Sequence, residues 1–333
     1  MIDPQTVDLS TEICGVRLAN PTVLASGILG LSGDVLARVA RAGAGAVVIK
    51  SCSLKPRVGH DNPVVVDYGA GTINAVGLAN PGVEAMVEEI RRARELLACP
   101  DQRTGLAPMR VPIIASIFAN SIYDFGTVAR YISEAEPDLI EANISCPNVE
   151  EEFGQIFSST PYVAAQVTRR VKASTNIPVI VKLSPNVPNI DEVAKAVVAA
   201  GADAISAINT VGPGMLVDVE TAKPVLSNRV GGLGGPAIKP IAIRCVYDIC
   251  NAVSVPVVGI GGIVTGRDAA EMITVGATAV GIGSGVHIRG IEVFGLVTRE
   301  LRELMASLSL QTLGQLRGRG LPEKTSSRRA ESP

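Results

Sequence analysis

The residues best suited to chemistry surround Cys146. Residues 143–148 read NISCPN, so this thiol has two asparagines and a serine as close polar neighbours. A cysteine thiolate acts as a nucleophile or as a general base. The chain has only two histidines, His60 and His287, and neither is near Cys146 in the sequence. Their distance disfavours a Cys–His pair for acyl transfer. The pattern favours proton abstraction by the thiol beside an electron-accepting cofactor, with an inert thiol as the alternative.

Two lysines each end an otherwise apolar run. Lys50 follows residues 46–49, and Lys182 lies in the run 179–183. At the end of a buried strand, the charge of a lysine must meet an anion or reach water. A flavin whose reduced ring carries negative charge would use one such cation, and an anionic substrate would use the other. A solvated lysine at the rim of the fold is the alternative.

Glycines follow the last two apolar runs. Gly261 and Gly262 come after 255–260, and Gly283 precedes Ser284 after 279–282. Glycine lets a backbone approach a bound anion closely, and the N–H groups of such turns bind phosphate. The pattern favours a phosphate site, with two ordinary tight turns as the alternative.

Eight short apolar runs, separated by segments of helical period, must position these residues. Near-continuous apolar runs are typical of parallel strands covered on both faces, and eight alternating units predict a closed (β/α)8 TIM barrel. An open doubly wound sheet is the alternative. The loops after the strands form the functional face of a barrel, where all of the residues above would meet. The predicted strands are 22–25, 46–50, 112–117, 139–143, 179–183, 204–208, 255–260 and 279–282, and the predicted helices are 34–42, 83–97, 123–135, 161–175, 190–200, 236–253, 266–275 and 291–307.

The remaining segments predict additions to this barrel. Segments 7–13 and 16–18, joined around Cys14 and Gly15, predict an N-terminal β-hairpin that plugs the N-terminal mouth. Long connections at 51–81 and 210–236 both follow strand ends, and long connections in a compact domain are usually functional. Residues 317–333 are basic, serine-rich and poor in apolar side chains, which predicts disorder. We therefore expect one domain over 1–310 and a disordered C-terminal tail over 311–333.

The composition excludes several classes of protein. The 333 residues carry 30 Lys+Arg and 32 Asp+Glu, a net charge of −2, which disfavours a nucleic-acid partner. The N-terminus lacks the features of a signal peptide, and no uncharged apolar stretch of about 18 residues predicts a membrane span. Six cysteines without a C-x-x-C pair, and two histidines, predict no metal site. We expect a cytoplasmic protein with reduced thiols.

Taken together and in this order, the motifs resemble the dihydroorotate dehydrogenase family over about residues 7–305. The cysteine at 146, preceded by Asn143, Ile144 and Ser145, is similar to the class 1B catalytic subunits. Class 2 members are membrane-associated, reduce quinone and carry serine at that position. The matching segments are 25–27, Lys50, 74–81, 143–148, 181–186, 208–210, 231–237, 261–262 and 283–284.

The resemblance implies that the chain binds one FMN and oxidises dihydroorotate to orotate in pyrimidine (UMP) biosynthesis. It implies that Cys146 is the general base, taking the proton from C5 while a hydride passes from C6 to N5 of FMN. A cation and amide donors suit the substrate carboxylate, and a flavin supplies hydride chemistry that side chains lack. The implied cofactor contacts are Ser26, Lys50, Ser51, Asn143, Lys182, Ile208, Gly235, Gly261, Gly262, Gly283 and Ser284. The implied substrate contacts are Lys50, Asn74, Ala75, Val76, Gly77, Leu78, Asn143, Asn148, Asn209 and Thr210.

The resemblance also implies a partner. Class 1B catalytic chains pair with an iron–sulfur flavoprotein that carries FAD and a 2Fe-2S cluster and passes electrons to NAD⁺. This chain has no clustered cysteines for an iron–sulfur centre and no G-x-G-x-x-G after a strand. Those sites would therefore lie on another polypeptide, with a homodimer of this chain as the core of a heterotetramer.

Two positions depart from the pattern of the family. Relatives usually carry a flavin-contacting asparagine at the end of the third strand, where this chain has Ser116 between Ala115 and Ile117. The loop after Cys146 carries three glutamates at 150–152, which would change loop closure or partner docking. Two other functions remain open: a dihydropyrimidine dehydrogenase-type FMN enzyme, and a non-catalytic barrel that binds a phosphorylated ligand.

Overall fold

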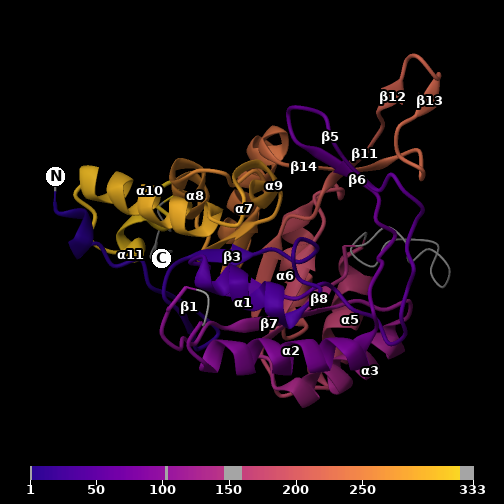
Figure 1. Ribbon diagram of the computed structural model, residues 1–333, viewed down its shortest axis with the longest axis horizontal. Coiled ribbons are helices and arrows are strands. Elements are labelled where there is room, and N and C mark those ends of the chain that lie inside the picture. Colours follow the sequence, from indigo (N-terminus) through magenta and orange to yellow (C-terminus); the bar gives the residue numbers. More distant parts are fainter. Residues whose placement is uncertain (1, 102–103, 146–159, 323–333) are drawn as a thin grey trace, which may run out of the picture.

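A closed barrel of eight parallel strands forms the centre of the molecule (Figure 1). The computed structural model describes residues 2–101, 104–145 and 160–322. Around the barrel the strands follow the order β3-β4-β7-β8-β9-β10-β15-β16. This order confirms the predicted (β/α)8 barrel and excludes the open sheet. The strands are β3 (Thr22–Leu24), β4 (Ala46–Val48), β7 (Ile113–Ile117), β8 (Leu139–Asn143), β9 (Val179–Leu183), β10 (Ala204–Ala207), β15 (Val257–Ile260) and β16 (Ala279–Ile282).

Helices with one apolar face cover the outside of the barrel. Several begin at a serine or threonine whose side chain accepts a backbone N–H, as Ser121 does from Asp124 and Thr265 does from Asp268. Gly201, just after one of these helices, has a φ of +101°, the left-handed conformation that glycine commonly adopts where a helix ends. The helices are α1 (Gly33–Arg41), α2 (Val83–Ala98), α3 (Ile122–Ile132), α5 (Pro161–Lys172), α6 (Ile190–Ala199), α7 (Lys239–Ala252), α8 (Gly266–Thr274), α9 (Ser284–Arg289), α10 (Val293–Ser307) and α11 (Leu313–Leu316), with 3-10 turns η1 (Pro4–Thr6), η2 (Ser133–Ala135) and η3 (Pro236–Ile238).

The two long connections pair with each other beyond the strand ends. β5 (Val65–Asp67) and β6 (Thr72–Asn74) come from the first connection, and β11 (Val211–Gly214) and β14 (Gly231–Gly234) come from the second. They form one antiparallel sheet in the order β11-β14-β6-β5. A further hairpin, β12 (Val217–Asp218) with β13 (Lys223–Pro224), extends away from the barrel (Figure 1). Residues far apart in the sequence thus form one structure at this end.

An N-terminal hairpin closes the opposite end. β1 (Thr11–Ile13) pairs with β2 (Val16–Leu18) through a turn at Cys14 and Gly15, whose φ values are +52° and +82°. Ile13 and Leu18 are fully buried and belong to an apolar cluster with strand residues such as Ile114 and Ile180. The hairpin therefore plugs the N-terminal mouth, as predicted.

The segment predicted as a tail begins with ordered structure. α11 lies at its start, and Leu313 and Leu316 are buried, so this part of the segment packs on the barrel. Residues 323–333 lie outside the described residues, and the division into 1–310 and 311–333 stays a prediction. Within the described part of the chain, no helix is both long and apolar enough to cross a bilayer.

We expect Ile13→Ala to lower the free energy of unfolding by about 2–5 kcal/mol, because it leaves a cavity beneath the barrel core. Urea denaturation followed by circular dichroism measures this change. Val219→Ala is the control, since Val219 is 84% exposed, and its effect should stay within about 0.5 kcal/mol. An equal, small effect of both substitutions would contradict the assignment of the hairpin as a plug.

Candidate functional site

The inside of the barrel changes from apolar to polar along the strands. Side chains alternate in direction along a strand, so residues two apart share a face. Ile114, Leu139 and Ile180 belong to the apolar cluster above the hairpin. The next inward positions are Ser116 on β7, Glu141 on β8 and Lys182 on β9, and all three are buried. The strands therefore carry polar groups inside the barrel only toward their carboxyl ends.

Glu141 is the centre of this polar layer. Its Oε1 accepts a hydrogen bond from Ser116 at 2.9 Å, and its Oε2 accepts one from Ser206 on β10 at 2.8 Å. The ammonium of Lys182 lies 3.9 Å from Oε1. The side chain of Glu141 is 4% exposed and that of Lys182 is 6% exposed. A buried charge is tolerated when it is paired and hydrogen-bonded, and this carboxylate meets both conditions.

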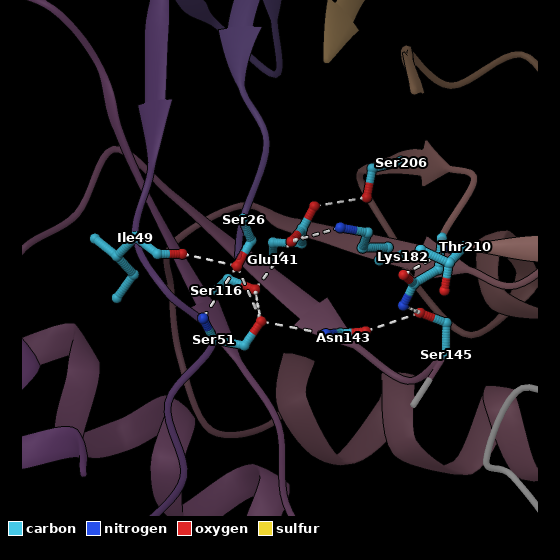
Figure 2. A network of polar contacts seen from close by, with 11 residues as sticks. Ser26, Ile49, Ser51, Ser116, Glu141, Asn143, Ser145, Lys182, Ser206 and Thr210 are labelled. Atoms are coloured by element: carbon cyan, nitrogen blue, oxygen red, sulfur yellow. Dashed lines mark hydrogen bonds and ion pairs between the residues drawn. The ribbon is translucent and has the colours of Figure 1, made fainter. Parts of the chain in front are cut away.

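A line of hydrogen bonds connects this layer with the open end of the barrel (Figure 2). Ser51, just after β4, contacts Ser116 at 2.8 Å, and the amide nitrogen of Asn143 donates to Ser51 at 3.2 Å. Ser145 donates to the amide oxygen of Asn143 at 2.8 Å. Asn209 donates to Ser145 at 2.7 Å. The structure thus brings together residues from β4, β7, β8 and β10 that are distant in the sequence.

Ser26 and Lys50 lie at the edge of this network. The hydroxyl of Ser26 donates to the carbonyl of Ile49 at 2.8 Å and accepts from the backbone N–H of Ser51 at 3.0 Å. Lys50 is half-buried, and its backbone N–H donates to the carbonyl of Gly30 at 2.8 Å. Both residues follow strands of the barrel, as predicted from their positions after apolar runs.

The four-stranded sheet carries the predicted substrate segment. Asn74 ends β6, and its side-chain amide donates to the carbonyl of Gly232 at 3.3 Å. Gly77 and Leu78 have φ values of +69° and +59°, so the chain turns sharply after this strand. Thr210 precedes β11 in the same sheet. The predicted substrate segment therefore begins in the sheet built by the two long connections, at Asn74, and continues into the turn that follows β6.

The predicted phosphate-binding glycines have steric reasons for lacking a side chain. Gly261 and Gly262 have φ values of +137° and +74°. A Cβ at Gly261 would lie 2.5 Å from the Cβ of Ala242, and one at Gly262 would lie 2.5 Å from that of Lys239. These contacts account for glycine at both positions, whether or not a phosphate binds. Gly283 precedes α9 directly, and Ser284 contacts Thr72 at 3.1 Å.

The carboxylate of Asp268 holds the start of α8, the helix that follows Gly261 and Gly262. Asp268 accepts hydrogen bonds from Thr265 at the start of α8 and, at 2.6 Å, from Lys239 on α7. Burial alone would raise the pKa of Asp268, but the hydrogen bonds from Lys239 and Thr265 outweigh it and lower the pKa. The contact joins the starts of two helices behind Gly261 and Gly262.

Burial makes most of the described cysteines unsuited to base chemistry. Cys52 is fully buried, and burial raises the pKa of its thiol to about 12. Burial likewise raises the pKa of Cys250 to about 12 and that of Cys14 to about 11. Cys99 is exposed. Cys146, Asn148 and the glutamates at 150–152 lie outside the described residues, so their predicted roles stay predictions.

The sequence reasoning missed Glu141 and Ser206. Each lies inside an otherwise apolar run, LIEAN for Glu141 and AISAI for Ser206. A charged residue within a strand that is buried on both faces needs a partner, and that was the available signal. Ser116, at the position where relatives usually carry a flavin-contacting asparagine, is fully buried and donates a hydrogen bond to Glu141. Among the residues that the structure describes, no group of three or more His, Cys, Asp or Glu side chains is placed to hold a metal ion.

These features define a class of protein: a (β/α)8 barrel whose inward polar side chains gather toward the carboxyl ends of its strands, the face where such barrels bind ligands. The family model for dihydroorotate dehydrogenase matches residues 8–305. The chain belongs to this family, which confirms the resemblance seen in the motifs.

Three relatives have the name dihydroorotate dehydrogenase B (NAD(+)), catalytic subunit. The chain is 41% identical to the protein of Methanothermobacter thermautotrophicus, over 93% of this chain and 97% of that protein. It is 44% identical to the protein of Methanocaldococcus jannaschii over the same shares. The protein of Geobacillus sp. is 41% identical, over 93% of this chain and 95% of its own length.

We expect iodoacetamide at pH 8 to label Cys99 in the folded protein and to leave Cys52 and Cys250 unmodified. Their raised pKa values leave little thiolate of either at this pH, and Cys52 is in addition fully buried. Peptide mass spectrometry measures the labelling, and denatured protein is the control in which all three react. Labelling of Cys52 as fast as that of Cys99 in folded protein would contradict the described packing.

Proposed function

We propose that this chain is the FMN-containing catalytic subunit of an NAD⁺-linked dihydroorotate dehydrogenase. It oxidises dihydroorotate to orotate, a step of pyrimidine (UMP) biosynthesis. The observation that carries this proposal is the polar mouth of the barrel, where Asn143, Lys182 and Asn209 meet at adjacent strand ends. The family of the chain and the names of its relatives support the same conclusion.

The chemistry of the donor set fits a flavin mononucleotide. Asn143 and Lys182 supply an amide and a cation for the polar edge of the ring system, and Ser26 and Ser51 supply hydroxyls beside them. When bound, FMN supplies the N5 atom that accepts a hydride, which no side chain can do. The further cofactor contacts in the proposal are Lys50, Ile208, Gly235, Gly261, Gly262, Gly283 and Ser284.

The substrate requires recognition of one carboxylate and several amide groups. In the proposal, Lys50 supplies the cation and Asn74, Asn143 and Asn209 supply amide donors and acceptors. Residues 75–78, which follow β6, and Thr210, which precedes β11, supply further contacts in the proposal. Asn148 completes the proposed set. The sheet covers the substrate from the side opposite the barrel.

Cys146 is the proposed general base, and it removes the proton from C5 of dihydroorotate. No thiol among the described residues competes for this role, because Cys14, Cys52, Cys245 and Cys250 all have a raised pKa through burial and Cys99 lies outside the polar network. Pro147 and the polar neighbours of Cys146 in the motif NISCPN support a loop position over the mouth.

The final electron acceptor requires a second polypeptide. The relatives have names that include both NAD(+) and catalytic subunit. We infer an electron-transfer partner that carries FAD and a 2Fe-2S cluster, bound to a homodimer of this chain in a heterotetramer. The cytoplasmic location stays a prediction from the sequence.

We expect Cys146→Ala to retain FMN but to lose turnover by about 100- to 10,000-fold, the usual contribution of a general base. Flavin absorbance measures retention of the cofactor, and reduction of an artificial acceptor measures turnover. Cys99→Ala is the control and should leave turnover unchanged. Normal turnover of the Cys146→Ala enzyme would remove this residue from the role of base.

Substrate and acceptor assays distinguish the proposal from its alternatives. We expect the purified chain to be yellow, to oxidise dihydroorotate with an artificial acceptor, and to reduce NAD⁺ only with its partner. Activity with dihydrouracil alone would identify the dihydropyrimidine type instead. A colourless protein that takes up no flavin would favour the non-catalytic barrel. Full NAD⁺ reduction by the isolated chain would contradict the proposed partner.

A further inference from the structure

The hydrogen bonds around Glu141 run in one direction. A carboxylate can only accept, so the hydroxyls of Ser116 and Ser206 must both donate to it. Each hydroxyl has one proton to donate, so Ser116, which donates to Glu141, cannot donate a second hydrogen bond. The contact of 2.8 Å between Ser116 and Ser51 must consequently be a bond donated by Ser51.

The directions of the next hydrogen bonds, at Ser51, Asn143 and Ser145, follow in turn. Ser51 donates its one hydrogen bond to Ser116, so it is the acceptor in its contact with Asn143. The amide nitrogen of Asn143 donates to it at 3.2 Å. The amide oxygen of Asn143 then faces the other way and accepts from Ser145 at 2.8 Å. Ser145 in turn accepts from the amide nitrogen of Asn209 at 2.7 Å. All donors along this line point from the open end of the barrel toward Glu141.

We propose that Glu141 is a positioning residue that sets which way the amide of Asn143 faces, acting through Ser116 and Ser51. The second N–H and the free lone pair of Asn143 are then available to a ligand in one arrangement only. An amide that can flip would present oxygen where the ligand needs a donor. This inference rests on the proposed function, because it takes orotate as the ligand of Asn143.

Ser206 provides a matched control. Ser116 and Ser206 are both buried, and each donates one hydrogen bond of nearly equal length to Glu141. Only Ser116 continues toward Asn143 through Ser51. Removing either hydroxyl therefore takes one hydrogen bond from the carboxylate of Glu141. Only removal of the Ser116 hydroxyl also leaves Ser51 without its acceptor, which frees the amide of Asn143 to turn.

The decisive experiment compares Ser116→Ala with Ser206→Ala. In FMN-loaded protein, we expect Ser116→Ala to weaken orotate binding about tenfold, the effect of losing about one oriented hydrogen bond, and Ser206→Ala to change it less than about twofold. Isothermal titration calorimetry measures the dissociation constant, and the unfolding midpoint shows whether both variants lose similar stability. Equal orotate affinities of the two variants, with wild-type binding intact, would overturn the inference.

Glu141→Gln tests whether Ser116 needs only an acceptor oxygen at this position or the negative charge of Glu141 as well. The ammonium of Lys182 lies near Oε1, so it favours an amide oxygen at that position and directs the new amide nitrogen toward Ser206. Ser116 then keeps its acceptor, and we expect orotate affinity within about threefold of wild type. A loss as large as that of Ser116→Ala would contradict an acceptor-based mechanism. If the wild-type protein binds neither FMN nor orotate, the proposed function fails instead.

Discussion

A negative charge buried inside the barrel organises the proposed site. Burying an unpaired carboxylate costs a large amount of folding free energy. Glu141 is accordingly surrounded by two hydroxyl donors and one ammonium. These partners come from β7, β10 and β9, so the requirement to satisfy one charge determines side chains on three other strands. The hydrogen bonds then continue to the strand ends, where a ligand would bind.

The two ends of the barrel have opposite roles. At the N-terminal end, Ile13 and Leu18 from the hairpin pack in one apolar cluster with strand residues such as Ile114, Leu139 and Ile180. At the C-terminal end, two long connections form a sheet that continues beyond the strands. Stability and ligand binding are thus assigned to different ends of the same strands, which is the usual division of labour in this fold.

Much of the fold could be predicted from periodicity. The eight apolar runs coincide with the barrel strands, because a strand buried on both faces leaves a continuous apolar signal. The pairing of β6 with β14 was not predictable, since their residues are about 160 positions apart and no local pattern encodes the partner. Helix α11, at the start of the expected tail, was not predicted either; its buried Leu313 and Leu316 pack it on the rest of the fold.

The candidate site was only partly predictable. Asn143 was found because it stands in the motif around Cys146 at the end of a predicted strand, and Ser51 came from the resemblance to the family. Glu141 was missed because sequence reasoning treated its strand as apolar throughout. The role of Glu141 depends on its contacts with Ser116, Lys182 and Ser206. These residues lie on other strands, and the closed barrel brings them close enough to bond to it.

A crystal structure of the purified protein with FMN and orotate would show the proposed site directly. We expect the flavin ring at the strand ends, within hydrogen-bonding distance of Asn143 and Lys182, with its phosphate beside Gly261 and Gly262. Orotate should contact the same asparagine through its amide. A flavin bound elsewhere, such as the surface groove lined by Pro188, Ile241 and Arg244, would contradict the central claim.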